Sequence, residues 1–333
     1  MFRTGSSLGR ILLAALLAAC AQAVAADSDP GPQSIIAHMA EATRTLNYEG
    51  TFVYSHENRL ETVRVIHAFQ SGRVRERLIH LNGTPREVLR DESGVTCIYP
   101  DARSVVVERN PPGEILQPAQ DMDVERLARH YRLSLGARAR IAGRDAQEVA
   151  IDPRDGYRYG YRLWVDRDSG LLLRSDLVDR GGELLEQILF VTLEVRDEIP
   201  DSALEPTIGV KGWSWFDESG RSSPEQGLDE GWSAHWLPPG FEPTTRSVRR
   251  LQRVPGPVRY LGFSDGLASV SVYIQEQSMV TEGGGSVASL GAAHAFSVAV
   301  EGHQVTVVGE VPAETVERVA NSVRRTATES RDD

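Results

Sequence analysis

Short runs of alternating apolar and polar residues follow one another from Tyr48 to Arg196, and this pattern constrains the fold more than any other feature. We count about eleven runs of a length usual for strands. Turn pairs close them, among them Glu57-Asn58, Ser71-Gly72 and Asn82-Gly83. Asn82-Gly83 is predicted to form a type I′ hairpin, because both residue types accept a positive φ. Sequential hairpins favour an antiparallel, strongly curved sheet over a βαβ fold.

Two helical patterns accompany the strands. Residues 34–46 place apolar side chains at helical spacing behind Ser34, a good N-cap, and a second helix is predicted over 122–131. A curved antiparallel sheet has one concave apolar face that an element must cover, so both helices are predicted to plug it. The last long run is predicted to place one set of side chains on a single face: Leu189, Val191, Leu193 and Val195.

The composition changes at residues 198–230, which are rich in proline, glycine and acidic residues. We interpret this segment as a linker between a sensor domain at 33–197 and a smaller domain at 231–325. Alternating runs continue in the second domain, and Pro312 opens a helix there. The polar residues 326–333 are predicted to be a disordered tail. The predicted fold class is α+β, mainly β, with a curved antiparallel half-barrel followed by a smaller α+β domain.

The first 26 residues are predicted to be a signal peptide. Arg3 and Arg10 precede a short apolar run, and small residues follow, as at a secretory cleavage site. The run is too short to span a bilayer. The alternative is a lipid anchor, because residues 17–20 also fit the pattern in which Cys20 is lipidated. Intact mass would distinguish the two, and after ordinary cleavage Cys97 is the one remaining cysteine, predicted to be an inert apolar thiol.

Several functions are disfavoured by the sequence. A net charge of −11 has the wrong sign for a nucleic-acid binder. The eight histidines show no metal-ligand spacing, and no phosphate loop or dinucleotide motif is present, so we expect no metal site, no cofactor and no enzyme activity. Residues 262–266 match the G-x-S-x-G pattern of hydrolases. A strand-like run follows this motif where a hydrolase needs a helix, so we predict a hairpin loop in which Ser264 and Asp265 make turn hydrogen bonds.

Two groups of residues remain as candidate binding sites. The first is an apolar interior able to accept an acyl chain, although most of its members also suit an ordinary core: Phe52, Tyr54, Tyr99, Trp164 and Phe190. The second combines aromatic and arginine residues, which are typical of protein interfaces but also of a domain edge. Its members are Trp232, Trp236, Phe241, Arg246, Arg249 and Arg250.

Several segments resemble the RseB/MucB family. Residues 47–54 resemble that family's opening strand, and the likeness continues through 75–78, 85–88, 158–161, 164–166 and 168–171. In the second domain it continues through 236–241, 264–267 and 307–312. The likeness therefore spans about residues 47–325 in consistent order, which is more specific than one short motif.

The resemblance implies a LolA/LolB-like half-barrel and a second domain that binds a partner. The implied role is that of a periplasmic regulator of the sigma-E (AlgU-type) envelope stress response. Such a protein binds the periplasmic domain of a membrane anti-sigma factor of the RseA/MucA type and shields it from site-1 proteolysis. Lipopolysaccharide or lipoprotein acyl chains would release it, and self-association is implied too. The alternative function is a LolA-like lipoprotein carrier, which would use the first domain alone.

Overall fold

The computed structural model describes residues 30–108, 123–217, 231–249, 256–276 and 285–326. The predicted signal peptide with Cys20, most of the predicted tail and Arg250 lie outside these residues. Within them, strands form a twelve-stranded sheet, a six-stranded sheet and a two-stranded pair. We call the first two the first sheet and the second sheet.

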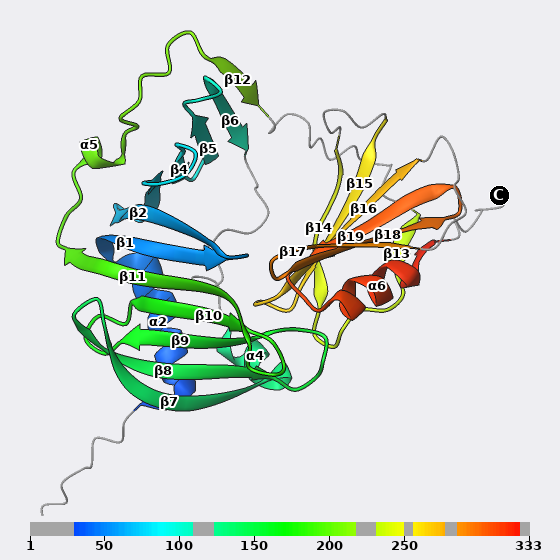
Figure 1. Ribbon diagram of the computed structural model, residues 1–333, viewed down its shortest axis with the longest axis horizontal. Helices are drawn as coiled ribbons and strands as arrows, with labels where there is room; N and C mark the ends of the chain where they lie inside the picture. The colour runs from blue at the N-terminus through cyan, green and yellow to red at the C-terminus, as the bar shows by residue number, and fades with distance from the viewer. Residues whose placement is uncertain (1–29, 109–122, 218–230, 250–255, 277–284, 327–333) are drawn as a thin grey trace, which may run out of the picture. The chain divides into compact units, whose positions relative to one another are not determined.

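The first sheet is antiparallel over eleven of its strands (Figure 1). Its strands stand in the order β12-β6-β5-β4-β3-β2-β1-β11-β10-β9-β8-β7, so most neighbours are consecutive hairpins and β11 returns to pair with β1. The bounds are β1 (Asn47–His56), β2 (Arg59–Gln70), β3 (Arg73–His80), β4 (Glu87–Asp91), β5 (Gly94–Tyr99), β6 (Ser104–Glu108), β7 (Tyr131–Ile141), β8 (Arg144–Pro153), β9 (Gly160–Asp166), β10 (Leu172–Val178), β11 (Leu184–Arg196) and β12 (Ser214–Asp217).

The turn at Glu57-Asn58 is a two-residue hairpin, as predicted. Both residues have a positive φ, 45° and 60°, which is the requirement of a type I′ turn. Asn82-Gly83 does not form the predicted hairpin. Gly83 has a positive φ of 72° but Asn82 does not, and a longer loop joins β3 to β4. The Asn82 side chain instead accepts a hydrogen bond from Thr62 N (2.6 Å) and donates one to Leu60 O (2.8 Å), which fixes the loop against β2.

The prediction that Leu189, Val191, Leu193 and Val195 share one face of β11 is wrong. The pairing of β1 with β11 skips Val191, since Thr51 faces Thr192 and Phe52 faces Phe190. This β-bulge shifts the alternation by one residue. Phe190 and Leu193 are therefore buried, whereas Val191 and Val195 are 48% and 41% exposed.

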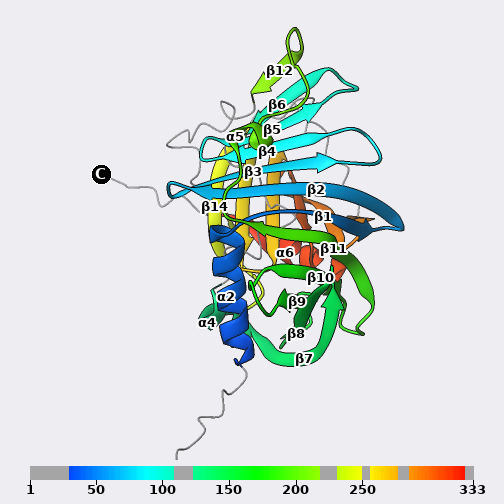
Figure 2. The same ribbon diagram turned by 90° about the vertical axis from the view of Figure 1, so that its left-hand side faces the viewer.

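Helices α2 (Pro32–Thr45) and α4 (Val124–His130) pack on one face of the first sheet. Figure 2 shows α2 running across the strands, which curve around it. Ile36 and Met39 of α2 are fully buried and pack with Leu127 of α4 and Leu163 of β9. Asp123 caps α4 by accepting a hydrogen bond from Arg126 N. The expected plug helices are thus present at nearly the predicted positions.

The segment predicted as a linker is partly ordered along the first sheet. It holds a short helix, α5 (Asp201–Leu204), and β12, which pairs in parallel with β6. Arg77 and Glu87, both about 3% exposed, form an ion pair beneath it. Arg77 also donates to Ala203 O, and Glu87 accepts from the Thr207 hydroxyl at 2.6 Å. These bonds anchor residues 203–207 to β3 and β4.

The second sheet has the order β14-β15-β16-β19-β18-β17 and is antiparallel throughout. Helix α6 (Ala313–Ser322) follows Pro312 as predicted, and its apolar stripe packs on the sheet. The remaining bounds are β13 (Trp232–Ala234), β14 (Glu242–Arg249), β15 (Val258–Ser264), β16 (Ser269–Glu276), β17 (Ser286–Leu290), β18 (Ala293–Val300), β19 (His303–Gly309) and β20 (Val323–Arg325), with β13 and β20 forming the pair. The fold class is therefore confirmed: a mainly β protein with a large curved sheet and a smaller α+β part.

Candidate functional site

The predicted acyl-chain residues are brought together in part. Phe52 and Phe190 are cross-strand neighbours, with ring centroids 5.4 Å apart, and both lie in the core beneath α2. Tyr54 and Trp164 pack against the same cluster and are partly buried. Tyr99 lies on β5 and does not belong to this cluster. Phe52, Tyr54 and Phe190 therefore form an aromatic face of the first sheet, whereas the pairing register places Trp164 beside Arg174 on the opposite face.

This aromatic face is filled by the chain itself. Phe52 is fully buried, and Ala42 of α2 belongs to the same cluster. Tyr54 has a second fixed role, since its hydroxyl donates to Glu186 Oε2 at 2.5 Å. Burial, and then this carboxylate, raises the pKa of Tyr54 far above its ordinary value. A ligand on this face would have to take the place of helix α2.

The predicted partner residues separate into core and surface. Trp232 and Phe241 are 4% and 6% exposed and belong to the core of the second sheet, so we remove them from the candidate surface. Trp236 is partly buried, and the Arg318 guanidinium of α6 lies 4.1 Å from its ring centroid. Arg246 on β14 is exposed. The Arg249 side chain and Arg250 lie outside the described residues.

The G-x-S-x-G motif forms the loop of the β15–β16 hairpin, as predicted. The Ser264 hydroxyl donates to Ala268 O and accepts from Gly266 N, each at 3.0 Å. Asp265 Oδ1 accepts from the backbone N–H groups of Leu267 and Ala268 at 2.8 and 2.7 Å. The serine is committed to turn geometry and does not stand at a helix N-terminus as a nucleophile would.

The same loop carries a buried ionic cluster that the sequence analysis did not identify. Residues from Pro32 onward belong to one compact unit. Asp265 Oδ2 accepts from the Arg158 guanidinium and from the Tyr131 hydroxyl, the latter at 2.8 Å. Arg158 also donates to both carboxylate oxygens of Asp155, at 3.1 and 2.8 Å, and to Pro239 O at 2.7 Å. We call Tyr131, Asp155, Arg158 and Asp265 the Arg158 cluster.

The Arg158 cluster is buried except at Asp155, whose side chain is 21% exposed. The side chains of Arg158 and Asp265 are both 0% exposed, and the guanidinium lies 5.1 Å from the Phe241 ring centroid. Burial, followed by the charge of Asp265, raises the pKa of Tyr131 well above its ordinary value. Burial disfavours the Arg158 charge, yet Tyr131, Asp265 and Asp155 together raise the pKa of Arg158. The cluster is therefore a fixed ion pair that ties the first sheet to the β15–β16 loop.

Further polar bonds support this junction. Arg126 of α4 donates to Ser264 O at 2.8 Å and to Gly240 O at 3.1 Å. The Thr315 hydroxyl of α6 donates to Tyr157 O at 2.9 Å, and Arg318 donates to the Tyr157 hydroxyl at 2.6 Å. Residues 155–158, between β8 and β9, thus contact the second domain, as does Arg126 of α4.

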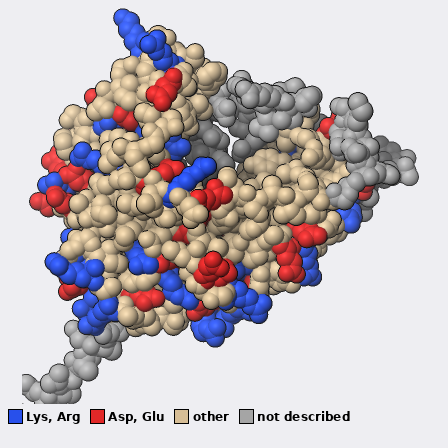
Figure 3. Space-filling model, in the orientation of Figure 1, with Lys and Arg blue, Asp and Glu red and all other residues tan. Residues whose placement is uncertain are grey.

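We next consider metal sites, membrane-spanning helices and charged surface patches. Among the described residues no cluster of histidine, cysteine or carboxylate side chains has the form of a metal site. No helix in the described ranges is long and apolar enough to cross a membrane. On the face shown in Figure 3, basic and acidic side chains are interspersed rather than gathered into patches of one sign.

Comparisons with known proteins assign both domains of the chain to one family. Residues 31–208 match the family model of the MucB/RseB N-terminal domain, and residues 226–324 match that of the MucB/RseB C-terminal domain. The sigma factor AlgU regulatory protein MucB of Pseudomonas aeruginosa is 36% identical over 97% of this chain and 98% of its own length. The sigma-E factor regulatory protein RseB of Salmonella typhimurium is 29% identical over 90% of this chain and 92% of its own length.

A solved structure supports the same assignment. The crystal structure of MucB in complex with MucA(peri) matches with a TM-score of 0.70 and 34% identity, covering 89% of this chain and all of that one. Both family models follow the chain in the expected order, and the similarity spans the two sheets together. This chain belongs to the MucB/RseB family.

Proposed function

We propose that this protein regulates a sigma factor by binding the periplasmic domain of its membrane anti-sigma factor. One observation carries the proposal: the similarity to MucB runs through both domains, and MucB was crystallised with MucA(peri). The described residues show two sheets joined by a buried polar junction, and Ser264 of the G-x-S-x-G motif donates to a backbone carbonyl within its own turn.

The proposed role includes protection. The bound protein would shield the anti-sigma factor from the site-1 protease and so hold the stress response off. It would act in the periplasm after residues 1–26 are removed as a signal peptide, with lipidation of Cys20 as the alternative. These steps follow from the family resemblance and the layout of the first residues.

The partner surface is proposed to include the exposed side of the second domain. Trp236 is partly accessible and Arg246 is exposed. Arg249 is on the same strand as Arg246, and Arg250 is the next residue in the sequence. Arginine beside an aromatic ring is common among the residues that dominate binding energies. Trp232 and Phe241 support this surface from the core instead of contacting a partner.

The release signal is proposed to be an acyl chain that replaces α2 on the aromatic face. Ile36 and Met39 are fully buried, so lifting α2 gives up roughly 1.5–3 kcal/mol for each side chain. Burying about ten methylene groups of a ligand would return roughly 8 kcal/mol before ordering costs. The free energy gained by burying a lipid chain can therefore offset the cost of displacing α2, whereas a small polar molecule has too little apolar surface to do so.

The alternative, a lipoprotein carrier, would need the first sheet alone. The second domain also matches the family, and it is joined to the first sheet through the Arg158 cluster, which argues for a function that uses both. A chain ending before Trp232 separates the two functions. Carrier activity would survive this truncation, whereas regulation would not.

Calorimetric titration tests partner binding directly. The protein without residues 1–26 is titrated with the purified periplasmic domain of the anti-sigma factor from the same genome. We expect saturable binding that weakens about tenfold or more in Arg246→Ala/Arg249→Ala, as for loss of charged interface residues. Arg59→Ala, an exposed arginine of the first sheet, is the control. Full affinity in the double variant would refute the surface, and absence of binding by the unaltered protein would refute the function.

A further inference from the structure

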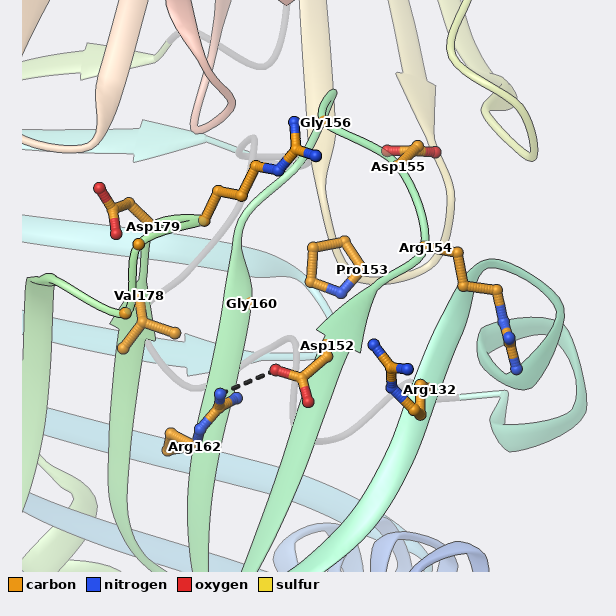
Figure 4. A pocket seen from close by; sticks show the side chains of 13 residues that line it. Arg132, Asp152, Pro153, Arg154, Asp155, Gly156, Gly160, Arg162, Val178 and Asp179 are labelled. Atoms are coloured by element: carbon orange, nitrogen blue, oxygen red, sulfur yellow. Dashed lines mark ion pairs between the residues drawn. The ribbon is translucent and has the colours of Figure 1, made fainter.

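A hollow of about 720 Å³ opens in the first sheet, away from the aromatic face (Figure 4). It lies where β8 ends and β9 begins, between residues 153–156 and the turn at 179–182. Ligand sites in proteins commonly enclose roughly 300–1,000 Å³, so the hollow is large enough for a few residues of a peptide. Neither the fold nor the proposed function assigns it a role.

The hollow exists because glycines stand at its base and rim. Gly160 lies in a strand between larger neighbours, and a Cβ there would come within 3.3 Å of Pro153 Cδ and 3.4 Å of Val178 Cγ2. Any other residue would crowd and fill this position. Gly182 lines the rim with no atom within 4 Å of the position of a Cβ, so a ligand can approach the backbone closely there, whereas Arg180 and Asp179 lie over Gly156 and Gly181.

Most charged groups of the lining already have partners. Arg162 pairs with Asp152 at 2.7 Å, and Figure 4 shows the two side chains pointing toward one another. Asp155 is held by Arg158 in the Arg158 cluster, and Asp179 Oδ1 accepts from Glu183 N at 2.8 Å. Arg154 donates to Tyr131 O and points away from Asp152 and Arg162. The lining is therefore a fixed frame of matched charges.

Two guanidinium groups are left over. Arg132 and Arg180 line the hollow, are exposed, and donate to no acceptor among the described residues. Arg132 stands on β7 directly opposite Asp152, and Arg180 Nη1 lies 3.4 Å from the position of a Cβ on Gly156. Each guanidinium presents a planar fork of N–H donors that matches a carboxylate.

We propose that this hollow binds the carboxylate side chain of an aspartate or glutamate in an extended peptide. Arg132 on β7 and Arg180 in the turn at 179–182 each supply an unpartnered positive charge to the lining, and the open backbone at Gly182 admits the peptide. The three aspartates around the hollow disfavour a dianion such as phosphate, whereas a single carboxylate meets less repulsion. The inference does not depend on the proposed anti-sigma partner, since any acidic peptide has this chemistry.

Fluorescence polarisation with short labelled peptides tests the proposal. The probes are two peptides of glycine and serine that differ at one central position, glutamate in one and glutamine in the other. Both are titrated with the unaltered protein, with Arg132→Gln/Arg180→Gln, and with the control Arg59→Gln/Arg140→Gln. The control removes the same charge from exposed arginines of the same sheet. Low ionic strength is used, and inorganic phosphate is added as a competitor.

We expect the glutamate peptide to bind about tenfold or more tightly than the glutamine peptide, as for one charge-assisted pair. The preference should vanish in Arg132→Gln/Arg180→Gln and persist in the control. Equal binding of the two peptides, or an unchanged preference in the test variant, would overturn the proposal. Binding of phosphate without binding of the glutamate peptide would overturn it too, in favour of a small-anion site. Failure of the anti-sigma titration would leave these outcomes unaffected.

Discussion

Asp265→Asn is the substitution that tests the junction most sharply. The variant keeps the size of the side chain and an oxygen that can accept from Leu267 N and Ala268 N, so the hairpin loop remains closed. It removes the negative charge beside Arg158, whose side chain is 0% exposed. Only the polar contacts with Asp155 and Pro239 O then compensate the buried guanidinium.

The expected loss follows from this geometry. Breaking a buried ion pair destabilises a protein by roughly 3–5 kcal/mol, and the surviving Asp155 places this variant near 3 kcal/mol. Urea unfolding followed by tryptophan fluorescence measures the change. Glu242→Gln, in which a 68% exposed partner of Arg126 loses its charge, is the control and should cost under about 1 kcal/mol.

A double-mutant cycle with Tyr131→Phe adds a second readout. Because the Tyr131 hydroxyl donates to the same Asp265 oxygen, the two changes should be coupled by about 0.5–3 kcal/mol. A cost for Asp265→Asn no larger than that of Glu242→Gln, together with additive effects, would refute the view that the Arg158 cluster holds the junction.

Three further predictions concern the first sheet. Glu76 is buried beside His67; burial alone would raise its pKa, but the His67 hydrogen bond and the charges of His67 and Arg90 lower it. Its stabilisation is therefore present above pH 4.5 and lost as the pH falls below that, so Glu76→Gln should cost about 3 kcal/mol at neutral pH and progressively less in acid. Urea titrations at several pH values measure this, and a pH-independent cost would contradict it. Phe52→Ala should cost roughly 3–5 kcal/mol in the same assay, because Phe52 is fully buried; a cost under about 1 kcal/mol would mean that the face is not packed. Asn82→Ala should cost about 1–2 kcal/mol in thermal unfolding through two lost hydrogen bonds, whereas Leu81→Ala, 54% exposed, should change little; equal effects would contradict the role of Asn82.

Local pattern predicted much of the fold. Glu57-Asn58 and Ser71-Gly72 form turns with positive φ as expected, and α2 and α6 begin close to Ser34 and Pro312. These features depend on a few neighbouring residues, which a sequence shows directly. The bulge at Val191 does not, because it is set by the pairing of β11 with β1 across more than a hundred residues.

The candidate site was harder to predict for the same reason. Phe52 and Tyr54 alternate along β1 and share one face with Phe190 of β11, but Trp164 lies beside Arg174 on the other face. Arg158 and Asp265 lie 107 positions apart, and each alone resembles a solvated charge. Trp232 and Phe241 show the converse, since an aromatic residue near arginines has the same appearance in a core as on an interface. The G-x-S-x-G pattern predicts that Asp265 makes turn hydrogen bonds. It does not show that the second carboxylate oxygen of Asp265 accepts from Arg158 and Tyr131.

Protection of the anti-sigma factor is the measurement that tests the central claim most directly. The purified periplasmic domain is incubated with the site-1 protease, with and without a saturating amount of this protein, and intact substrate is followed over time. We expect cleavage to slow strongly, and less so with Arg246→Ala/Arg249→Ala. An unchanged cleavage rate at saturation would contradict the proposal that this chain restrains a sigma factor by shielding its regulator.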